Sequence, residues 1–212
     1  MKGEAGVLLV IAALILFAAG SYIGLVVLPP SPEKALENNY RIIFFHVPTA
    51  VNSFLAFTVT LVSGVLYLKT RDSKYDVIAY SSAVVGFFYI TAALISGSIW
   101  ANRAWGTYWN WDPRETTVLI LWFVYAAYFA LRSAIDSPED KARISSIYAI
   151  FAYVTVPLSY LSTRIWFSLH PATAEIHIKI GIPLMLNMFA FTLLYIALTY
   201  LNYKAEKLTE VV

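Results

Sequence analysis

Two histidines and a tryptophan-rich segment are the residues of this sequence that could do chemistry. His46 and His170 lie far apart in the chain, and between them Trp105, Trp109 and Trp111 stand within seven residues. Imidazole is a common axial ligand of haem iron, and indole rings supply flat surface that can stack on a macrocycle. The pattern therefore indicates a site for a flat, metal-centred ligand, with His46 and His170 as its metal ligands.

Each of these residues also has a purely structural interpretation. A histidine near membrane depth can simply bond a loop carbonyl, and tryptophan and tyrosine are enriched at both membrane interfaces. Belt residues scatter singly on helix ends, whereas here Tyr108 stands among three tryptophans. That density favours binding. His177 follows His170 by seven residues without an aromatic setting, so we expect it at the membrane surface.

The end of the tryptophan segment reads as a helix start. Asp112 suits the N-cap, Pro113 the first helical position and Glu115 the third, as in a capping box. Asp112 therefore has a structural role whether or not it meets a ligand. A capped helix end also fixes where Trp109 and Trp111 emerge.

Arginines near the tryptophans could bind carboxylates of the ligand. Haem carries two propionates, and the planar guanidinium matches a carboxylate. Arg103 and Arg114 flank the tryptophans and are the candidates, whereas Arg41 and Arg164 are expected to contact lipid headgroups. The chain has no cysteine, which excludes thiolate ligands and the Cys-x-x-Cys-His attachment of covalent haem. We therefore expect a haem at this site to be bound non-covalently, as haem b is.

The composition indicates that membrane-spanning helices position these residues. The chain has 212 residues, 59% of them hydrophobic and 13% charged, with a net charge of +2. This charge is too small to suggest nucleic acid as a partner, and no P-loop is present. Apolar runs of about 20 residues can each cross a bilayer, and without an alternating strand pattern they must be helices. We predict an all-α, polytopic membrane protein, a single domain over 1–212 with an outer tryptophan-rich loop at about 101–114. Its six transmembrane helices are expected at about 5–28, 42–68, 76–100, 115–132, 144–163 and 181–203.

The basic residues orient these spans. With the N-terminus inside, nine of the fifteen lysines and arginines fall in inner segments and six in outer ones, in the sense of the positive-inside rule. Both termini are then cytoplasmic. The three histidines and the tryptophan-rich loop all fall on the outer face.

The segment from Trp105 to Thr116 resembles the tryptophan-rich "WWD" signature of the haem-handling cytochrome c assembly proteins. The segment from Arg41 to Ala50 is similar to the histidine-bearing second helix of their CcmC branch (haem exporter protein C). The resemblance covers nearly the whole chain, and only the short CcmC pattern fits 212 residues. It implies a membrane protein that holds haem at the outer face of the inner (cell) membrane. His46 and His170 would be the axial ligands, and Trp105, Trp109, Trp111 and Asp112 the platform.

The resemblance also implies partners. Haem would be presented to a membrane-tethered chaperone of the CcmE type, and a CcmA/CcmB-type ABC transporter and a CcmD-type small subunit would join the complex. The alternatives are a CcsA-like cytochrome c synthetase component, a b-type electron-transfer subunit, or a transporter or scaffold without haem. No acid–base pair or activated nucleophile stands out, so we do not expect an enzyme, although the chain could assist covalent haem attachment to a partner.

Overall fold

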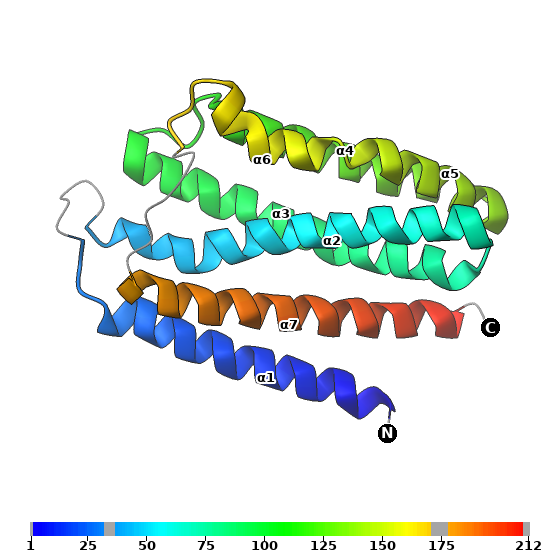
Figure 1. Cartoon of the computed structure of the whole chain (residues 1–212), viewed down its shortest axis with the longest axis horizontal. Helices are drawn as coiled ribbons and strands as arrows, with labels where there is room; N and C mark the ends of the chain where they lie inside the picture. The colour runs from blue at the N-terminus through cyan, green and yellow to red at the C-terminus, as the bar shows by residue number, and fades with distance from the viewer. Residues whose placement is uncertain (1, 32–36, 171–177, 210–212) are drawn as a thin grey trace.

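The computed structural model describes residues 2–31, 37–170 and 178–209, and all regular structure in these ranges is helical (Figure 1). The helices are α1 (Lys2–Tyr22) with a π-helical end η1 (Ile23–Val27), the short 3-10 helix η2 (Asn39–Ile42), α2 (Ile43–Thr70), α3 (Ser73–Trp105), α4 (Pro113–Ser133), α5 (Pro138–Ala152), α6 (Thr155–Ile165) and α7 (Ile178–Thr209). The prediction of an all-α chain is confirmed.

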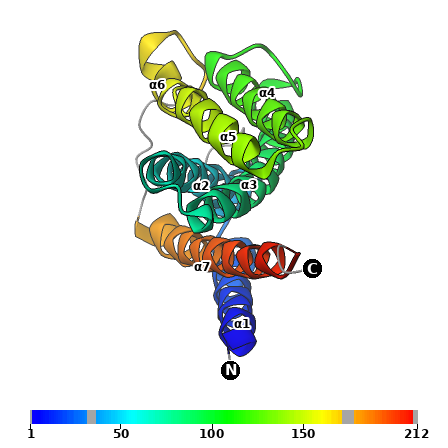
Figure 2. The ribbon, with the colours of Figure 1, turned by 90° about the vertical axis from the view of Figure 1, so that its right-hand side faces the viewer.

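The helices form three layers around a central pair. α2 packs along α3, α7 covers one side of this pair, and α4 with α5 and α6 covers the other. α1 packs mainly on α7 and forms the outermost layer (Figure 2). Six helical stretches in the described ranges are long and apolar enough to cross a membrane, so the six predicted spans are confirmed.

The central pair is close because its facing residues are small. A Cβ atom at Gly86 of α3 would lie 2.8 Å from the Cβ of Ala56 in α2. Ser82 donates to the carbonyl oxygen of Ala56 and pairs with the hydroxyl of Tyr195 in α7, at 2.8 and 2.7 Å. Small residues and short hydroxyl bonds of this kind let transmembrane helices approach without a hydrophobic driving force.

The fifth span is broken into two helices. α5 ends at Ala152 and α6 begins at Thr155, within one apolar stretch over Pro138–Ile165. Pro157 explains the break, because a proline lacks the N–H that would bond the carbonyl four residues earlier and its ring crowds that group. The break leaves α6 as a separate short helix beside α4, with Arg114 at the start of α4 bonded to carbonyl oxygens of α6.

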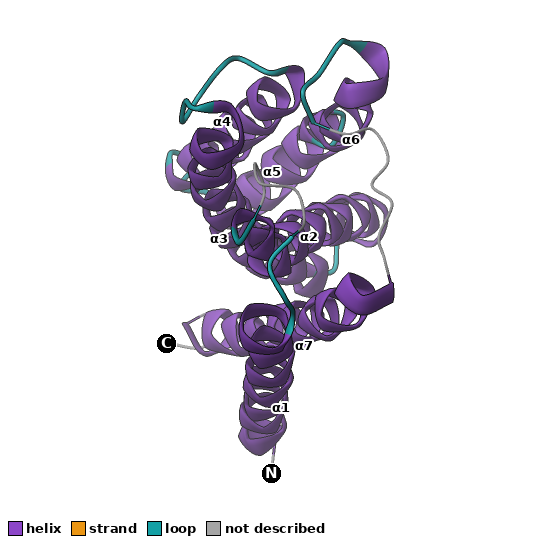
Figure 3. Cartoon of the chain, turned by 90° about the vertical axis from the view of Figure 1, so that its left-hand side faces the viewer, coloured by secondary structure: helices purple, strands orange, loops and turns teal. Residues whose placement is uncertain are grey.

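Because the helices run along the bundle, the connections between them lie at its two ends. α1 begins and α7 ends at one end of the bundle (Figure 1). At this end Arg132 makes a bidentate ion pair with Asp76, with N–O distances of 2.6 and 2.9 Å. Figure 3 looks onto the other end, with the loops before α2 and α4 and after α6. This second end carries His46, His170 and the tryptophans.

The tryptophan-rich loop is shorter than expected. α3 continues to Trp105, and the loop proper spans only 106–112. Gly106 ends the helix with a φ of 78°, a left-handed conformation that glycine adopts at little cost. Trp105 is therefore a helical residue, whereas Trp109 and Trp111 lie in the loop.

Candidate functional site

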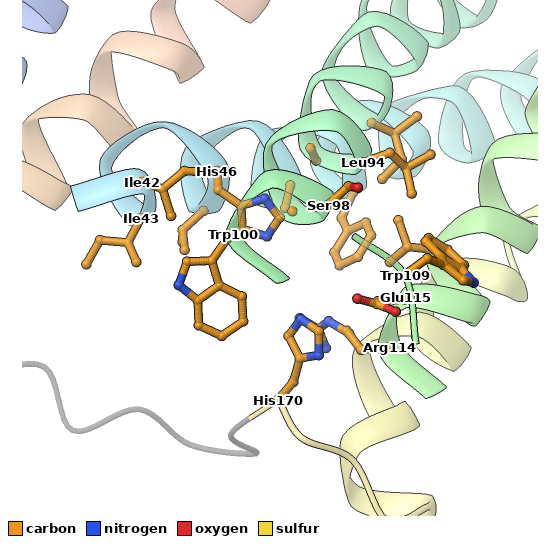
Figure 4. Close-up of a pocket in the computed structure, with 17 residues that line it drawn as sticks. Ile42, Ile43, His46, Leu94, Ser98, Trp100, Trp109, Arg114, Glu115 and His170 are labelled. Carbon is orange, nitrogen blue, oxygen red and sulfur yellow. The ribbon is translucent and has the colours of Figure 1, made fainter. Parts of the chain in front are cut away.

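A cavity of about 340 Å³ opens at this end of the bundle, between α2, α3, α4 and the segment that follows α6. Such a volume is in the range of small-molecule pockets. Both candidate ligands reach it, and Figure 4 shows the rings of His46 and His170 approaching the same space from different sides. The lining is mostly apolar and consists of Ile42, Ile43, His46, Val47, Ala50, Phe54, Ile90, Ala93, Leu94, Gly97, Ser98, Trp100, Trp109, Arg114, Glu115, Val118 and His170.

His46 lies in the first turns of α2 and faces α3. Its Nδ1 is 3.0 Å from the hydroxyl oxygen of Ser96. That hydroxyl already donates to the carbonyl oxygen of Ala92 at 2.7 Å, so it accepts the proton of Nδ1. The ring fits because position 97 is glycine, where a Cβ atom would lie 2.9 Å from His46 Cε1. The Nε2 atom of His46 consequently keeps a free lone pair.

His170 is held in the same way by a different group. Its Nδ1 lies 3.0 Å from Oδ1 of Asp112, whose side chain is only 1% exposed. Burial raises the pKa of Asp112, but hydrogen bonds from the N–H groups of Leu169 and Arg114 and from the Ser168 hydroxyl outweigh it, and the pKa is lowered. Burial lowers the pKa of His170 despite the neighbouring carboxylate. A neutral imidazole beside an ionised carboxylate carries its proton on Nδ1, so Nε2 is again free.

Asp112 joins two distant parts of the chain. It caps α4, as predicted, by accepting the N–H of Arg114 at 2.8 Å. It also accepts the N–H of Leu169 at 2.7 Å and the hydroxyl of Ser168 at 2.9 Å. Glu115 reaches further back than the capping box suggests, because its Oε2 accepts the N–H of Asn110 at 3.1 Å. These bonds fix the loop and the His170 segment to the start of α4.

The tryptophans divide into three environments. Trp109 lines the cavity. Trp105 is not among the lining residues, but its ring packs against that of His170 with centroids 4.9 Å apart. Trp111 is 72% exposed with a φ of 64°, and its ring meets Trp109 edge-on at 5.9 Å. The loop therefore directs one indole inward and one outward.

The two candidate arginines also differ. Arg114 lines the cavity and donates to the carbonyl oxygens of Ser159 and Tyr160 in α6, at 3.1 and 3.2 Å. Arg103 is exposed in the last turn of α3 and is not among the lining residues. Arg41 points elsewhere, toward the carbonyl oxygens of Leu25 and Leu28 at the end of α1.

Trp100 and Glu115 line the cavity, although the sequence pattern did not mark them as site residues. Trp100 lines the cavity and packs on Trp105 and His170, with centroids 4.8 and 5.7 Å away. Glu115 is 9% exposed, and its Oε1 has no hydrogen-bond partner in the described part of the chain. The spacing of Ser96, Gly97 and Trp100 on one helical face was the available signal. His177 lies outside the described residues.

Comparison with known proteins shows the family of this chain. A family model described as CcmC, Heme exporter protein C, matches residues 1–211. The chain belongs to the CcmC family. A relative named "Heme exporter protein C" from Haemophilus influenzae is 31% identical over 98% of this chain and 87% of its own length. The CcmC relative from Escherichia coli K12 is 29% identical over 92% of this chain and 80% of its own. A "putative cytochrome c biosynthesis ccmC-like mitochondrial protein" from Marchantia polymorpha is 31% identical over 83% and 76%.

Proposed function

We propose that this chain binds haem b non-covalently in the cavity, with Nε2 of His46 and Nε2 of His170 as the axial ligands. The observation that carries the proposal is the pair of imidazoles whose Nδ1 atoms are both occupied and whose rings reach one cavity. Occupied Nδ1 atoms leave Nε2 as the ligating atom on each ring. Membership of the CcmC family, with relatives named as haem exporters, supports haem as the cargo.

The donor set fits haem better than a bare metal ion. In the described residues, no three or more histidine, cysteine, aspartate or glutamate side chains are grouped to hold a metal ion. Two histidines suffice for haem, because the macrocycle supplies the remaining ligands of iron. The apolar wall of Ile43, Val47 and Leu94 suits the porphyrin faces, and Arg114 offers a charged donor to a propionate.

The aromatic platform belongs to the same proposal. Trp109 would contact the macrocycle directly, and Trp105 would support the ring of His170. Asp112 would orient His170 rather than touch the ligand. The exposed side chains of Trp111 and Arg103 would meet a partner or a part of the ligand that extends beyond the cavity.

We further propose that the chain delivers haem to a partner protein. The cavity lies at the helix ends away from both chain termini, which the basic residues orient toward the outer face of the inner membrane. A haem at a helix end is accessible to a partner, whereas an electron-transfer haem is usually deep in a bundle. The recipient would be a CcmE-type haem chaperone, in a complex with a CcmA/CcmB-type ABC transporter and a CcmD-type small subunit. The role is binding and handover in cytochrome c maturation rather than catalysis.

The test is the absorption spectrum of the purified full-length protein in detergent, before and after adding haem. We expect a Soret band and sharp visible bands of six-coordinate, low-spin haem. His46→Ala and His170→Ala should each change these bands, and added imidazole should restore them by filling the vacated position. A double variant with the unaltered wild-type spectrum would refute the ligand assignment, and rapid reversible reduction by a quinol would favour electron transfer instead.

A further inference from the structure

The two candidate ligands are supported by chemically different groups. The proton on Nδ1 of His170 points at a buried carboxylate, that of Asp112. The corresponding proton of His46 points at a neutral hydroxyl, that of Ser96. Both bonds measure 3.0 Å, so the contrast is one of charge and not of distance.

The carboxylate cannot turn away from His170. Its two oxygens accept hydrogen bonds from the Ser168 hydroxyl and from the N–H groups of Arg114 and Leu169, at 2.7 to 2.9 Å. The side chain is only 1% exposed. Four surrounding donors, the imidazole included, keep the negative charge next to the ring.

The hydroxyl that supports His46 is a weaker acceptor. The Ser96 oxygen carries no charge, and its proton is shared between the carbonyl oxygens of Ala92 and Ala93, at 2.7 and 3.2 Å. A hydrogen bond to an ionised acceptor is roughly twice as strong as one between neutral groups. A carboxylate behind a ligating histidine also raises the basicity of the other ring nitrogen.

We infer that the site is asymmetric: His170 is the strong ligand that retains haem, and His46 is the weaker ligand that an incoming ligand displaces first. Asp112 is then a positioning residue that acts through His170. Ser96 positions His46 in the same way, through a weaker hydrogen bond. This inference rests on the proposed function. It adds an order of release, in which haem is freed on the α2–α3 side while the α4 side still holds it.

The experiment is a double-mutant cycle on haem affinity, measured by titrating haem into the purified full-length protein. His46→Ala leaves only His170 as a ligand, and His170→Ala leaves only His46. We expect His46→Ala to bind haem at least about tenfold more tightly than His170→Ala. Asp112→Asn should weaken binding by about 10- to 100-fold in the His46→Ala background, the usual effect of removing an outer partner of a metal ligand. In the His170→Ala background it should change the affinity by less than about threefold.

Two further variants separate charge from misfolding. Ser168→Ala removes a donor to Asp112 and the acceptor of the His170 backbone N–H, but it keeps the carboxylate on the imidazole. It should therefore weaken binding less than Asp112→Asn in the His46→Ala background. Ser96→Ala should act only where His46 is present, and by less than about tenfold.

Two results would overturn the inference, and a third would refute the proposed function. Equal losses from Asp112→Asn in both backgrounds would mean that Asp112 supports the fold and not His170, and would overturn the inference. Tighter binding by His170→Ala than by His46→Ala would do the same. A wild-type protein that takes up no haem would instead refute the proposed function itself.

Discussion

Gly97 packs against His46, and this contact permits a sharp test of the site. A methyl group at position 97 should displace the imidazole of His46 without unfolding α3. In Gly97→Ala, the new Cβ would lie 2.9 Å from His46 Cε1 and 3.5 Å from Nδ1. Ordinary contact begins near 3.4 Å. The ring must therefore withdraw by about 0.5 Å, from 2.9 Å to 3.4 Å.

The consequences follow from the size of this shift. The Nδ1–Oγ bond to Ser96 is 3.0 Å, and lengthening it by about 0.5 Å takes it beyond good hydrogen-bond geometry. Overpacking costs about 1–3 kcal/mol, and the greater helix propensity of alanine offsets about 1 kcal/mol. The free energy of unfolding should thus fall by no more than about 2 kcal/mol. Haem affinity should fall by several-fold but by less than about tenfold, below the usual effect of losing an outer partner of a metal ligand, because the lost acceptor is a neutral hydroxyl.

Haem titration and thermal unfolding in detergent measure the two effects separately. Gly64→Ala is the matched control, since its Cβ would meet Ser146 at an ordinary 3.4 Å and Gly64 is not among the cavity residues. In a His46→Ala background, Gly97→Ala should no longer affect haem affinity. Wild-type affinity in Gly97→Ala alone would refute the placement of His46 in the ligand set.

Three further predictions concern the cavity wall, the far end of the bundle and pH. Trp100→Ala should weaken haem binding roughly three- to tenfold, the worth of an aromatic contact, whereas the same change at the exposed Trp111 should have a smaller effect in the same titration. Asp76→Asn should lower the free energy of unfolding by about 3 kcal/mol, because it leaves the mostly buried Arg132 without its carboxylate; an unchanged melting temperature would contradict this. Because the pKa of His170 is lowered below its ordinary 6.5, the unfolded state binds a proton that the folded state does not. The haem-free protein should therefore lose stability as the pH falls from 7 through about 6, and His170→Gln should lose less over that range.

Much of the architecture is a local property of the sequence. The six spans follow from apolar runs long enough to cross a bilayer, because a backbone in lipid must satisfy its own hydrogen bonds. The start of α4 is equally local, since Asp112 and Pro113 act within one turn. α3 continues past its apolar run to its C-cap Gly106, because hydropathy reports where apolar character fades and not where the helix stops.

The candidate site was predicted only in its residue types. Histidine and tryptophan in this arrangement pointed to a flat ligand, yet nothing local distinguishes Trp109, which lines the cavity, from Trp111, which is exposed. Trp111 has a φ of 64°, and its ring meets that of Trp109 edge-on from the exposed side. Arg103 and Arg114 both flank the tryptophans in the sequence, but only Arg114 lines the cavity, where it donates to carbonyl oxygens of α6.

The sequence by itself thus determined the helices, the caps and glycines at their ends, and the kinds of side chain gathered at one end of the bundle. These depend on interactions within a few residues and on the length of apolar runs. The tertiary structure alone decided which groups meet, because the partners lie 50 residues apart for His46 and Ser96 and 58 apart for His170 and Asp112. Only the close packing of α2 on α3, and the return of the chain after α6 to the start of α4, bring a hydroxyl to one imidazole and a carboxylate to the other.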